Sequence, residues 1–152
     1  MRVDIARRHR PLVVLLGPTA VGKSRVAIQV AKHFDTEILT ADSRQVYRGM
    51  DIGTDKPTAE DLQRVRHRLL DLVNPDDAFN TGWYRRAALD HIEQLYVADR
   101  LPLVVGGTGL YISTLIRGLC PAPQADPIVR ADLKKLREQA GRTGLYAELI
   151  RV

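Results

Sequence analysis

Short apolar segments alternate along the chain with segments whose apolar residues recur at helical spacing. Residues 11–16 form an unbroken apolar run that contains β-branched valines and ends at a glycine, which is typical of a buried parallel strand. Within residues 23–34, apolar side chains fall at positions 26, 27, 30, 31 and 34, and this spacing predicts an amphipathic helix. The chain therefore begins with a strand followed by a helix.

The same alternation continues downstream. Further strands are predicted at residues 37–42, 68–73 and 101–105, and further helices at residues 82–98 and 110–116; on the inner side of the first of these helices we expect Trp83, Ala87 or Ala88, Ile92, Leu95 and Tyr96. Strands that alternate with helices predict an α/β fold, in which a parallel sheet carries helices on both faces. Four strands make a thin sheet and the chain ends on apolar residues, so we expect it to be truncated at its C-terminus.

The pattern changes after residue 116. Residues 120–125 contain prolines and show no periodicity, whereas Asp126 and Pro127 have the character of a helix cap and a first helical residue. The helix that follows has an apolar face at positions 129, 133, 136 and 140, is interrupted at Gly141, and gives way to a second helical pattern at residues 145–152. We therefore expect a core over residues 1–120 and the start of a separate helical part over residues 121–152.

Composition and charge limit the function classes. The chain has 152 residues, of which 45% are hydrophobic and 27% charged, as in a soluble globular domain. No apolar run approaches the length of a membrane helix, and the basic N-terminus lacks the apolar core of a signal peptide. The single Cys120 excludes an internal disulfide and fits a reducing compartment. We expect a cytoplasmic monomer that does not associate with membranes.

The net charge of +5 arises mostly from arginine, since only five of the basic residues are lysine. Arginine donates paired hydrogen bonds to phosphate, so this composition is compatible with a nucleic acid or a diphosphate as partner. It is equally compatible with a bias in the coding composition of the source.

Residues 17–24 match the phosphate-binding loop G-x-x-x-x-G-K-[ST] at every constrained position, directly after the first strand and before the first helix. Its glycines let backbone N–H groups converge on phosphate oxygens, and the helix N-terminus adds partial positive charge. Lys23 supplies a full charge, and Ser24 offers a hydroxyl to magnesium. The loop predicts a site for a diphosphate or a nucleotide.

The acidic residues near this loop differ from those of most nucleotide hydrolases and kinases. Such enzymes usually place an aspartate at the end of another core strand to hold magnesium, but the last predicted strand ends in Gly106 and Gly107. The acid expected at a strand end near the loop is Asp42. Residues 43–45 follow it with polar groups suited to reading a base edge.

Four blocks of sequence together resemble the tRNA dimethylallyltransferase family. They are residues 17–24, residues 41–57 (Ala-Asp-Ser-Arg-Gln-Val-Tyr-Arg-Gly-Met-Asp-Ile-Gly-Thr-Asp-Lys-Pro), residues 67–71 (His-Arg-Leu-Leu-Asp) and residues 105–111 (Val-Gly-Gly-Thr-Gly-Leu-Tyr). They occur in the family's order and spacing, and the similarity runs from about residue 11 to the end. The resemblance implies a fold like that of P-loop NTPases and kinases, and transfer of a dimethylallyl group from dimethylallyl diphosphate to the exocyclic N6 amine of an adenosine beside the tRNA anticodon.

The resemblance also assigns roles to residues. Asp42 would be the general base at the amine, and Thr108 would hydrogen-bond near it. The diphosphate, with Mg²⁺ on Ser24, would lie on Gly17, Pro18, Thr19, Ala20, Val21, Gly22, Lys23 and Ser24. Contacts to tRNA would come from Asp42, Ser43, Arg44, Gln45, Thr108 and Arg130, and the helical part from residue 121 would begin a tRNA-binding insertion that is incomplete here.

Other interpretations stay open. Members of the family are considerably longer, so the chain could be an incomplete, inactive fragment. A P-loop kinase that uses ATP, with Asp42 as base, is the alternative enzyme. Thr108 could be only a helix cap, Arg130 a solvated charge, and His67, which lies between two arginines, a structural residue.

Overall fold

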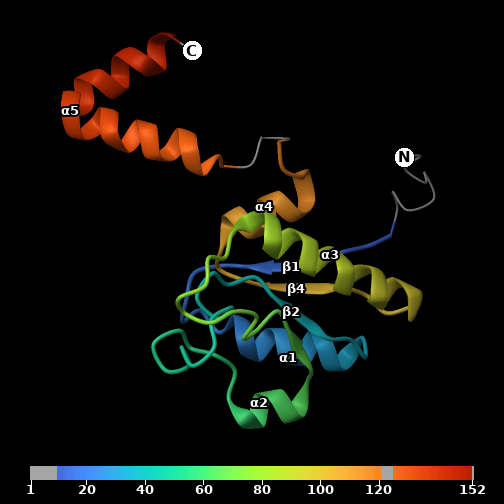
Figure 1. The fold of residues 1–152 in the computed structure, drawn as a ribbon. Coiled ribbons are helices and arrows are strands. Elements are labelled where there is room, and N and C mark those ends of the chain that lie inside the picture. Colours follow the sequence, from blue (N-terminus) through green and yellow to red (C-terminus); the bar gives the residue numbers. More distant parts are fainter. Residues whose placement is uncertain (1–9, 121–124, 152) are drawn as a thin grey trace. The chain divides into compact units, whose positions relative to one another are not determined.

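The computed structural model describes residues 10–120 and 125–151 and divides into two compact units, one ending at Leu119 and one starting at Cys120. The first unit contains a parallel four-stranded sheet with helices, and the second contains a helical hairpin (Figure 1). The proline-containing connection predicted at residues 120–125 lies largely outside the described residues.

The sheet consists of strands β1 (Val13–Leu16), β2 (Ile38–Thr40), β3 (His67–Arg68) and β4 (Leu103–Gly106) in the order β1-β4-β2-β3. Every pair is parallel. The last strand in sequence thus lies between the first two, with Leu16 opposite Gly106 and Thr40 opposite Val105. Because the strands are parallel, the loops that follow β1, β4 and β2 all emerge at one edge of the sheet, where α/β proteins bind their ligands.

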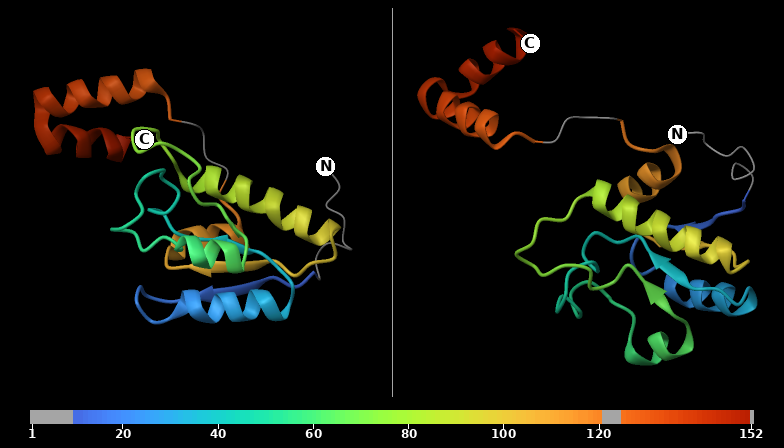
Figure 2. Two further views of the ribbon diagram at one scale, coloured as in Figure 1. Left: turned by 90° about the horizontal axis from the view of Figure 1, so that it is seen from below. Right: turned by 45° about the vertical axis from the view of Figure 1, so that its right-hand side comes forward.

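Helices cover both faces of this sheet, as the alternating sequence pattern predicts. Helix α1 (Lys23–His33) lies on one face, and α3 (Thr81–Val97) and α4 (Gly109–Arg117) lie together on the other (Figures 1 and 2). The alternation of side chains along the central strands explains the two layers. Ile38 and Leu103 pack toward α1, whereas Leu39 and Val104 pack toward α3 and α4, because successive side chains of a strand point to opposite faces.

The strand predicted at residues 68–73 is wrong over most of its length. Strand β3 ends at Arg68, since Leu69 and Asp71 adopt positive φ angles of 65° and 53°. Extended pairing cannot continue through left-handed backbone. Val73 instead forms an isolated parallel bridge with Tyr47.

Two features of the helices also differ from expectation. The helical spacing predicts Trp83 on the inner side of α3, but this residue is 52% exposed, whereas its neighbour Tyr84 is fully buried and stacks on Tyr111 with 4.1 Å between ring centroids. The short helix α2 (Ala59–Arg64) was not predicted, although Thr58 and Asp61 form a reciprocal capping box at its start.

The second unit consists of α5 (Pro127–Arg151), which is broken at Gly141 by a φ of 63° and a ψ of −156°. Its predicted start is confirmed, since the Asp126 carboxylate accepts a 2.7 Å hydrogen bond from the N–H of Ile128. The apolar face of the helix includes Val129 and Leu133, which are 54% and 41% exposed. No helix in the described part of the chain is both long and apolar enough to cross a membrane.

Candidate functional site

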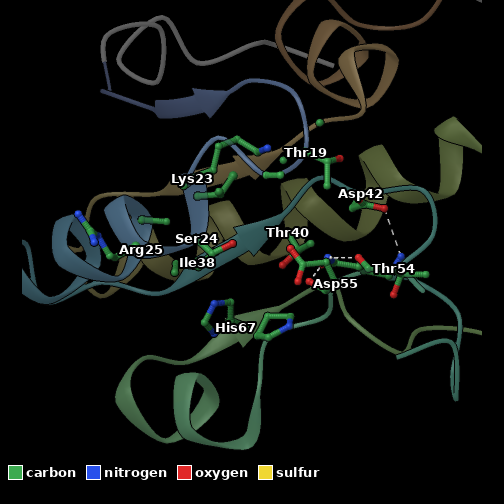
Figure 3. A pocket seen from close by; sticks show the side chains of 18 residues that line it. Thr19, Lys23, Ser24, Arg25, Ile38, Thr40, Asp42, Thr54, Asp55 and His67 are labelled. Carbon is green, nitrogen blue, oxygen red and sulfur yellow. Dashed lines mark hydrogen bonds between the residues drawn. The ribbon is translucent and has the colours of Figure 1, made fainter. Parts of the chain in front are cut away.

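A cleft of about 380 Å³ opens at the edge of the sheet where the loops after β1, β4 and β2 meet (Figure 3). One wall is the predicted phosphate loop and the start of α1, and the opposite wall is the segment that follows residue 53 together with β3. The polar and charged side chains that line it are those of Thr19, Lys23, Ser24, Arg25, Thr40, Asp42, Gln45, Thr54, Asp55 and His67.

The phosphate loop takes the conformation that its glycine spacing predicts. Gly22 precedes α1 with a φ of 85°, and Ala20 also has a positive φ, of 66°. No side chain of the described residues caps α1, so the N–H groups of its first turn are available to an anion. The ammonium group of Lys23 donates to the carbonyl oxygen of Pro18 and thus lies over the loop.

The individual residues of this loop are placed differently. Thr19, Ala20, Gly22, Lys23 and Ser24 line the cleft. Gly17, Pro18 and Val21 belong to the loop without lining the cleft, and Val21 is 59% exposed.

Asp42 follows β2 and lines the cleft, as predicted for the acid at a strand end. Its Oδ1 accepts hydrogen bonds from the N–H groups of Arg44 and Gln45, at 2.8 Å and 3.3 Å. These two bonds fix the carboxylate at the start of a turn. No group within residues 10–120 and 125–151 forms a hydrogen bond with Oδ2, so this oxygen can accept a proton from a ligand.

Thr108 is joined to the end of β2 by two hydrogen bonds. Its N–H donates to the carbonyl of Ala41 at 3.1 Å, and its Oγ1 accepts from the N–H of Ser43 at 2.9 Å. Thr108 stands at the N-cap position of α4, but its side chain makes no capping hydrogen bond to that helix. The hydroxyl keeps a proton to donate, and it lies next to the Asp42 turn.

Gly106 permits this close approach of β4 to β2. A Cβ atom at this position would lie 2.1 Å from the carbonyl oxygen of Ala41, a distance that no side chain could tolerate. The absence of a side chain at Gly106 is therefore required for Thr108 to reach Ala41 and Ser43, the two neighbours of Asp42 in the chain.

The residues expected to contact tRNA lie in three different places. Gln45 lines the cleft, and its Nε2 donates to the carbonyl oxygens of Thr54 and Asp55, both at 2.9 Å. Arg44 is exposed and borders a separate hollow formed with residues 49–54. Arg130 is exposed on α5, in the second unit.

Polar residues outside the predicted site also line the cleft, among them Asp55, which the sequence interpretation missed, and His67, which it treats as structural. His67 lines the cleft with its Nδ1 2.9 Å from the carbonyl oxygen of Val65. Burial lowers the pKa of His67 below its usual 6.5, against the opposing effects of that hydrogen bond and of Asp61, so the imidazole is neutral at neutral pH. Both residues lie within the sequence blocks that carried the family resemblance, and this was the available signal.

The parallel sheet and the loop at its edge define a P-loop protein with an α/β core. The family pattern described as IPP transferase matches residues 45–152, and that described as isopentenyl transferase matches residues 11–78. The chain belongs to the IPP transferase family.

Relatives and solved structures agree with this assignment. The chain is 47% identical to tRNA dimethylallyltransferase 1 of Syntrophotalea carbinolica, over 98% of this chain and 48% of the relative. It is 46% identical to tRNA dimethylallyltransferase of Methylococcus capsulatus, over 93% of this chain and 46% of the relative. The chain thus spans about half the length of the curated relatives it matches.

Two solved structures share the fold. The full-length tRNA isopentenylpyrophosphate transferase of Bacillus halodurans superimposes with a TM-score of 0.72 at 38% identity, covering 93% of this chain and 47% of the other. A eukaryotic dimethylallyltransferase acting on tRNA gives a TM-score of 0.78 at 25% identity, covering 93% of this chain and 35% of the other.

Proposed function

We propose that this chain carries the donor-binding and catalytic core of a tRNA dimethylallyltransferase. The P-loop holds the diphosphate of dimethylallyl diphosphate, and the dimethylallyl group passes to the N6 amine of an adenosine beside the anticodon. Support comes from the family assignment and from relatives named tRNA dimethylallyltransferase.

One observation carries the proposal: the Asp42 carboxylate, which forms no ion pair among the described residues, borders the phosphate loop, and the Thr108 hydroxyl is bonded to the backbone of the same turn. Asp42 lines the P-loop cleft, and the hydrogen bond from Ser43 to Thr108 holds the threonine beside its turn. An exocyclic amine is a poor nucleophile, and a base within hydrogen-bond reach is what its attack needs. The pairing of these groups with a phosphate loop fits transfer to an amine.

The residues of the cleft can accept both products of the transfer, the proton and the diphosphate. The N6 nitrogen forms a bond to C1 of the dimethylallyl group while the bond from C1 to the diphosphate oxygen breaks, and the diphosphate leaves with the electron pair. The proton lost from N6 passes to Oδ2 of Asp42, since Oδ1 already accepts two backbone hydrogen bonds. Lys23 and the N–H groups at the start of α1 stabilise the negative charge of the leaving group.

Magnesium fits the loop only together with the diphosphate. Among the described residues there is no cluster of three or more His, Cys, Asp or Glu side chains that could hold a metal by themselves. The Ser24 hydroxyl lines the cleft at the position that P-loop proteins use for Mg²⁺, and phosphate oxygens would supply further ligands. The ion would neutralise part of the charge on the diphosphate.

The proposed contacts to tRNA involve both units. We assign the adenosine to the region beside Asp42, Ser43, Gln45 and Thr108, and the base must leave its stack to reach the cleft. Arg44 and Arg130 are exposed cations suited to phosphate contacts, and we assign the helical unit to tRNA binding.

The decisive experiment is Asp42→Asn in the full-length protein. Asparagine keeps the shape and the hydrogen bonds of the turn but cannot accept the proton. We expect the diphosphate affinity to stay unchanged and the transfer rate to fall by about 100-fold or more, the usual contribution of a positioned base. The measurement is single-turnover transfer of labelled dimethylallyl to an anticodon stem-loop.

The matched control is Asp76→Asn, the same change at an exposed loop aspartate, which should leave transfer unchanged. Full activity in Asp42→Asn would remove this residue from the mechanism. If the wild-type protein phosphorylates a small molecule with ATP and transfers no prenyl group, it is a kinase and the proposal is wrong.

A further inference from the structure

The charged side chains that line the P-loop cleft carry no net charge. Lys23 and Arg25 are balanced by Asp42 and Asp55, and His67 is neutral because burial lowers its pKa. An organic diphosphate carries between about two and three negative charges at neutral pH. The partial charge at the start of α1 offsets only about half of one charge, so a diphosphate needs a further cation to bind tightly here.

Asp55 faces this cleft from the wall opposite Ser24 (Figure 3). Among the residues that the structure describes, none forms a hydrogen bond or an ion pair with its carboxylate. The adjacent Lys56 does not neutralise it, because the ammonium group is held by Asp51 at 2.7 Å and Asp71 at 2.6 Å. In the open cleft water solvates Asp55, but a bound diphosphate would displace that water and meet an unpaired negative charge.

The segment around Asp55 is held in place by its neighbours. Gln45 donates to the carbonyl oxygens of Thr54 and Asp55, and the Thr54 hydroxyl donates to the carbonyl of Met50. Lys56 also donates to the carbonyl of Tyr47 at 2.7 Å. These bonds use the backbone of the segment and leave the Asp55 carboxylate available, so its position in the cleft wall is fixed while its charge is unused.

We propose that Asp55 is the carboxylate that holds Mg²⁺, through bound water, against the diphosphate opposite Ser24. It replaces the strand-end aspartate of other P-loop enzymes, for which β4 offers only Gly106 and Gly107. This role turns the repulsion between Asp55 and the diphosphate into attraction, because the divalent cation lies between them. The inference rests on the proposed function in requiring a diphosphate in the loop.

The test compares pyrophosphate binding by calorimetry with and without Mg²⁺ in the full-length protein and in Asp55→Asn. Asparagine suits the φ of 53° at this position, since Asn and Asp both tolerate left-handed backbone. A carboxylate about 6 Å from a divalent ion in water contributes roughly tenfold in affinity. We expect the gain in affinity from Mg²⁺ to fall roughly tenfold, while binding without Mg²⁺ stays unchanged or tightens.

The matched control is Asp99→Asn, the same change at a φ of 54° outside the cleft, which should keep the full gain from Mg²⁺. The number of Mn²⁺ ions bound in the presence of pyrophosphate, counted by electron paramagnetic resonance, gives a second readout. An unchanged gain in Asp55→Asn would overturn the inference, as would an equal loss of affinity with and without Mg²⁺. Because these readouts use pyrophosphate alone, loss of the metal role would leave the prenyl-transfer proposal intact, and that proposal fails separately if no prenyl group is transferred.

Discussion

The two ends of β2 carry two carboxylates with opposite surroundings. Glu37, just before the strand, has a side chain that is only 10% exposed and that pairs with Arg68 at 2.6 Å and Arg100 at 3.1 Å. Asp42, just after the strand, opens onto the cleft, and within the described part of the chain its carboxylate accepts hydrogen bonds only from the backbone of its own turn. The same strand thus positions one acid for stability and another for chemistry.

The difference follows from the direction of the parallel strands. Their carboxyl ends converge on the ligand edge, where an arginine beside Asp42 would compete for the proton-accepting oxygen. At the opposite end of the strand, Arg68 and Arg100 pair with Glu37. Burial alone would raise the pKa of Glu37, but the hydrogen bond and charge of Arg68, with Arg100 and Arg66, outweigh it and lower the pKa.

The largest effect on folding is expected for Glu37→Gln, which leaves the arginines without their carboxylate. We expect the free energy of unfolding at pH 7 to fall by about 2–3 kcal/mol, with diphosphate affinity unchanged. Because the folded-state pKa of Glu37 is lowered, its contribution is complete above its ordinary pKa of 4.5 and is lost as the pH falls through the lowered value. The difference in the free energy of unfolding between the wild type and Glu37→Gln, measured with urea, should therefore become smaller below pH 4.5.

The control for this prediction is Glu60→Gln on α2. Its carboxylate lies 3.9 Å from Arg64 and its side chain is 81% exposed, so its loss should change stability by less than about 0.5 kcal/mol. Equal effects of the two substitutions would show that the arginines around Glu37 contribute no more than a surface pair.

Lys23→Ala tests the cleft beside the carboxyl end of β2. There we expect the ammonium group to bind the diphosphate and not to pair with Asp42. Removing the ammonium group should weaken pyrophosphate or dimethylallyl diphosphate binding at least tenfold, which corresponds to a charge-assisted contact of roughly 1.5–3 kcal/mol. Calorimetry measures this affinity. Lys32→Ala, at an exposed position on the same helix, should have no effect, and equal affinities in all three proteins would mean that the loop is not the donor site.

Thr108→Ala should have the smallest effect. It removes the acceptor of the 2.9 Å bond from Ser43 and should cost about 1 kcal/mol of stability, with a smaller loss of prenyl transfer than Asp42→Asn. Thr108→Ser, which keeps the hydroxyl, should restore both in thermal unfolding and single-turnover assays. If the serine variant behaves like alanine, the methyl group rather than the hydroxyl is what matters.

Contiguous features could be predicted from the sequence. The phosphate loop, α1 and the start of α5 all follow from residues that are neighbours in the chain, such as Gly22 before Lys23 or Asp126 before Pro127. A prediction that depends on the backbone angle of a single residue can fail. The strand expected through residue 73 ends early because Leu69 and Asp71 turn left-handed, and no propensity rule predicts that conformation for a leucine.

The choice between Trp83 and Tyr84 for the buried side of α3 shows a related limit. The two residues are adjacent, and the spacing of apolar residues in α3 is compatible with either on the buried side. Which of them is buried depends on the residues that pack against the helix. Tyr84 stacks on Tyr111 of α4, a contact between segments that the helical period of α3 alone does not specify.

The sequence by itself determined the α/β class, the phosphate loop and the carboxylate at the end of β2, because each depends on short-range periodicity or on a motif of adjacent residues. Only the tertiary structure decided that β4 lies between β1 and β2. That strand order brings Thr108 next to the turn at Asp42, and it requires that Gly106 has no side chain. The tertiary structure also decided that Gln45 holds the segment carrying Asp55 at the cleft. Contacts between separate segments depend on packing in three dimensions, which the pattern of residues along the chain does not specify.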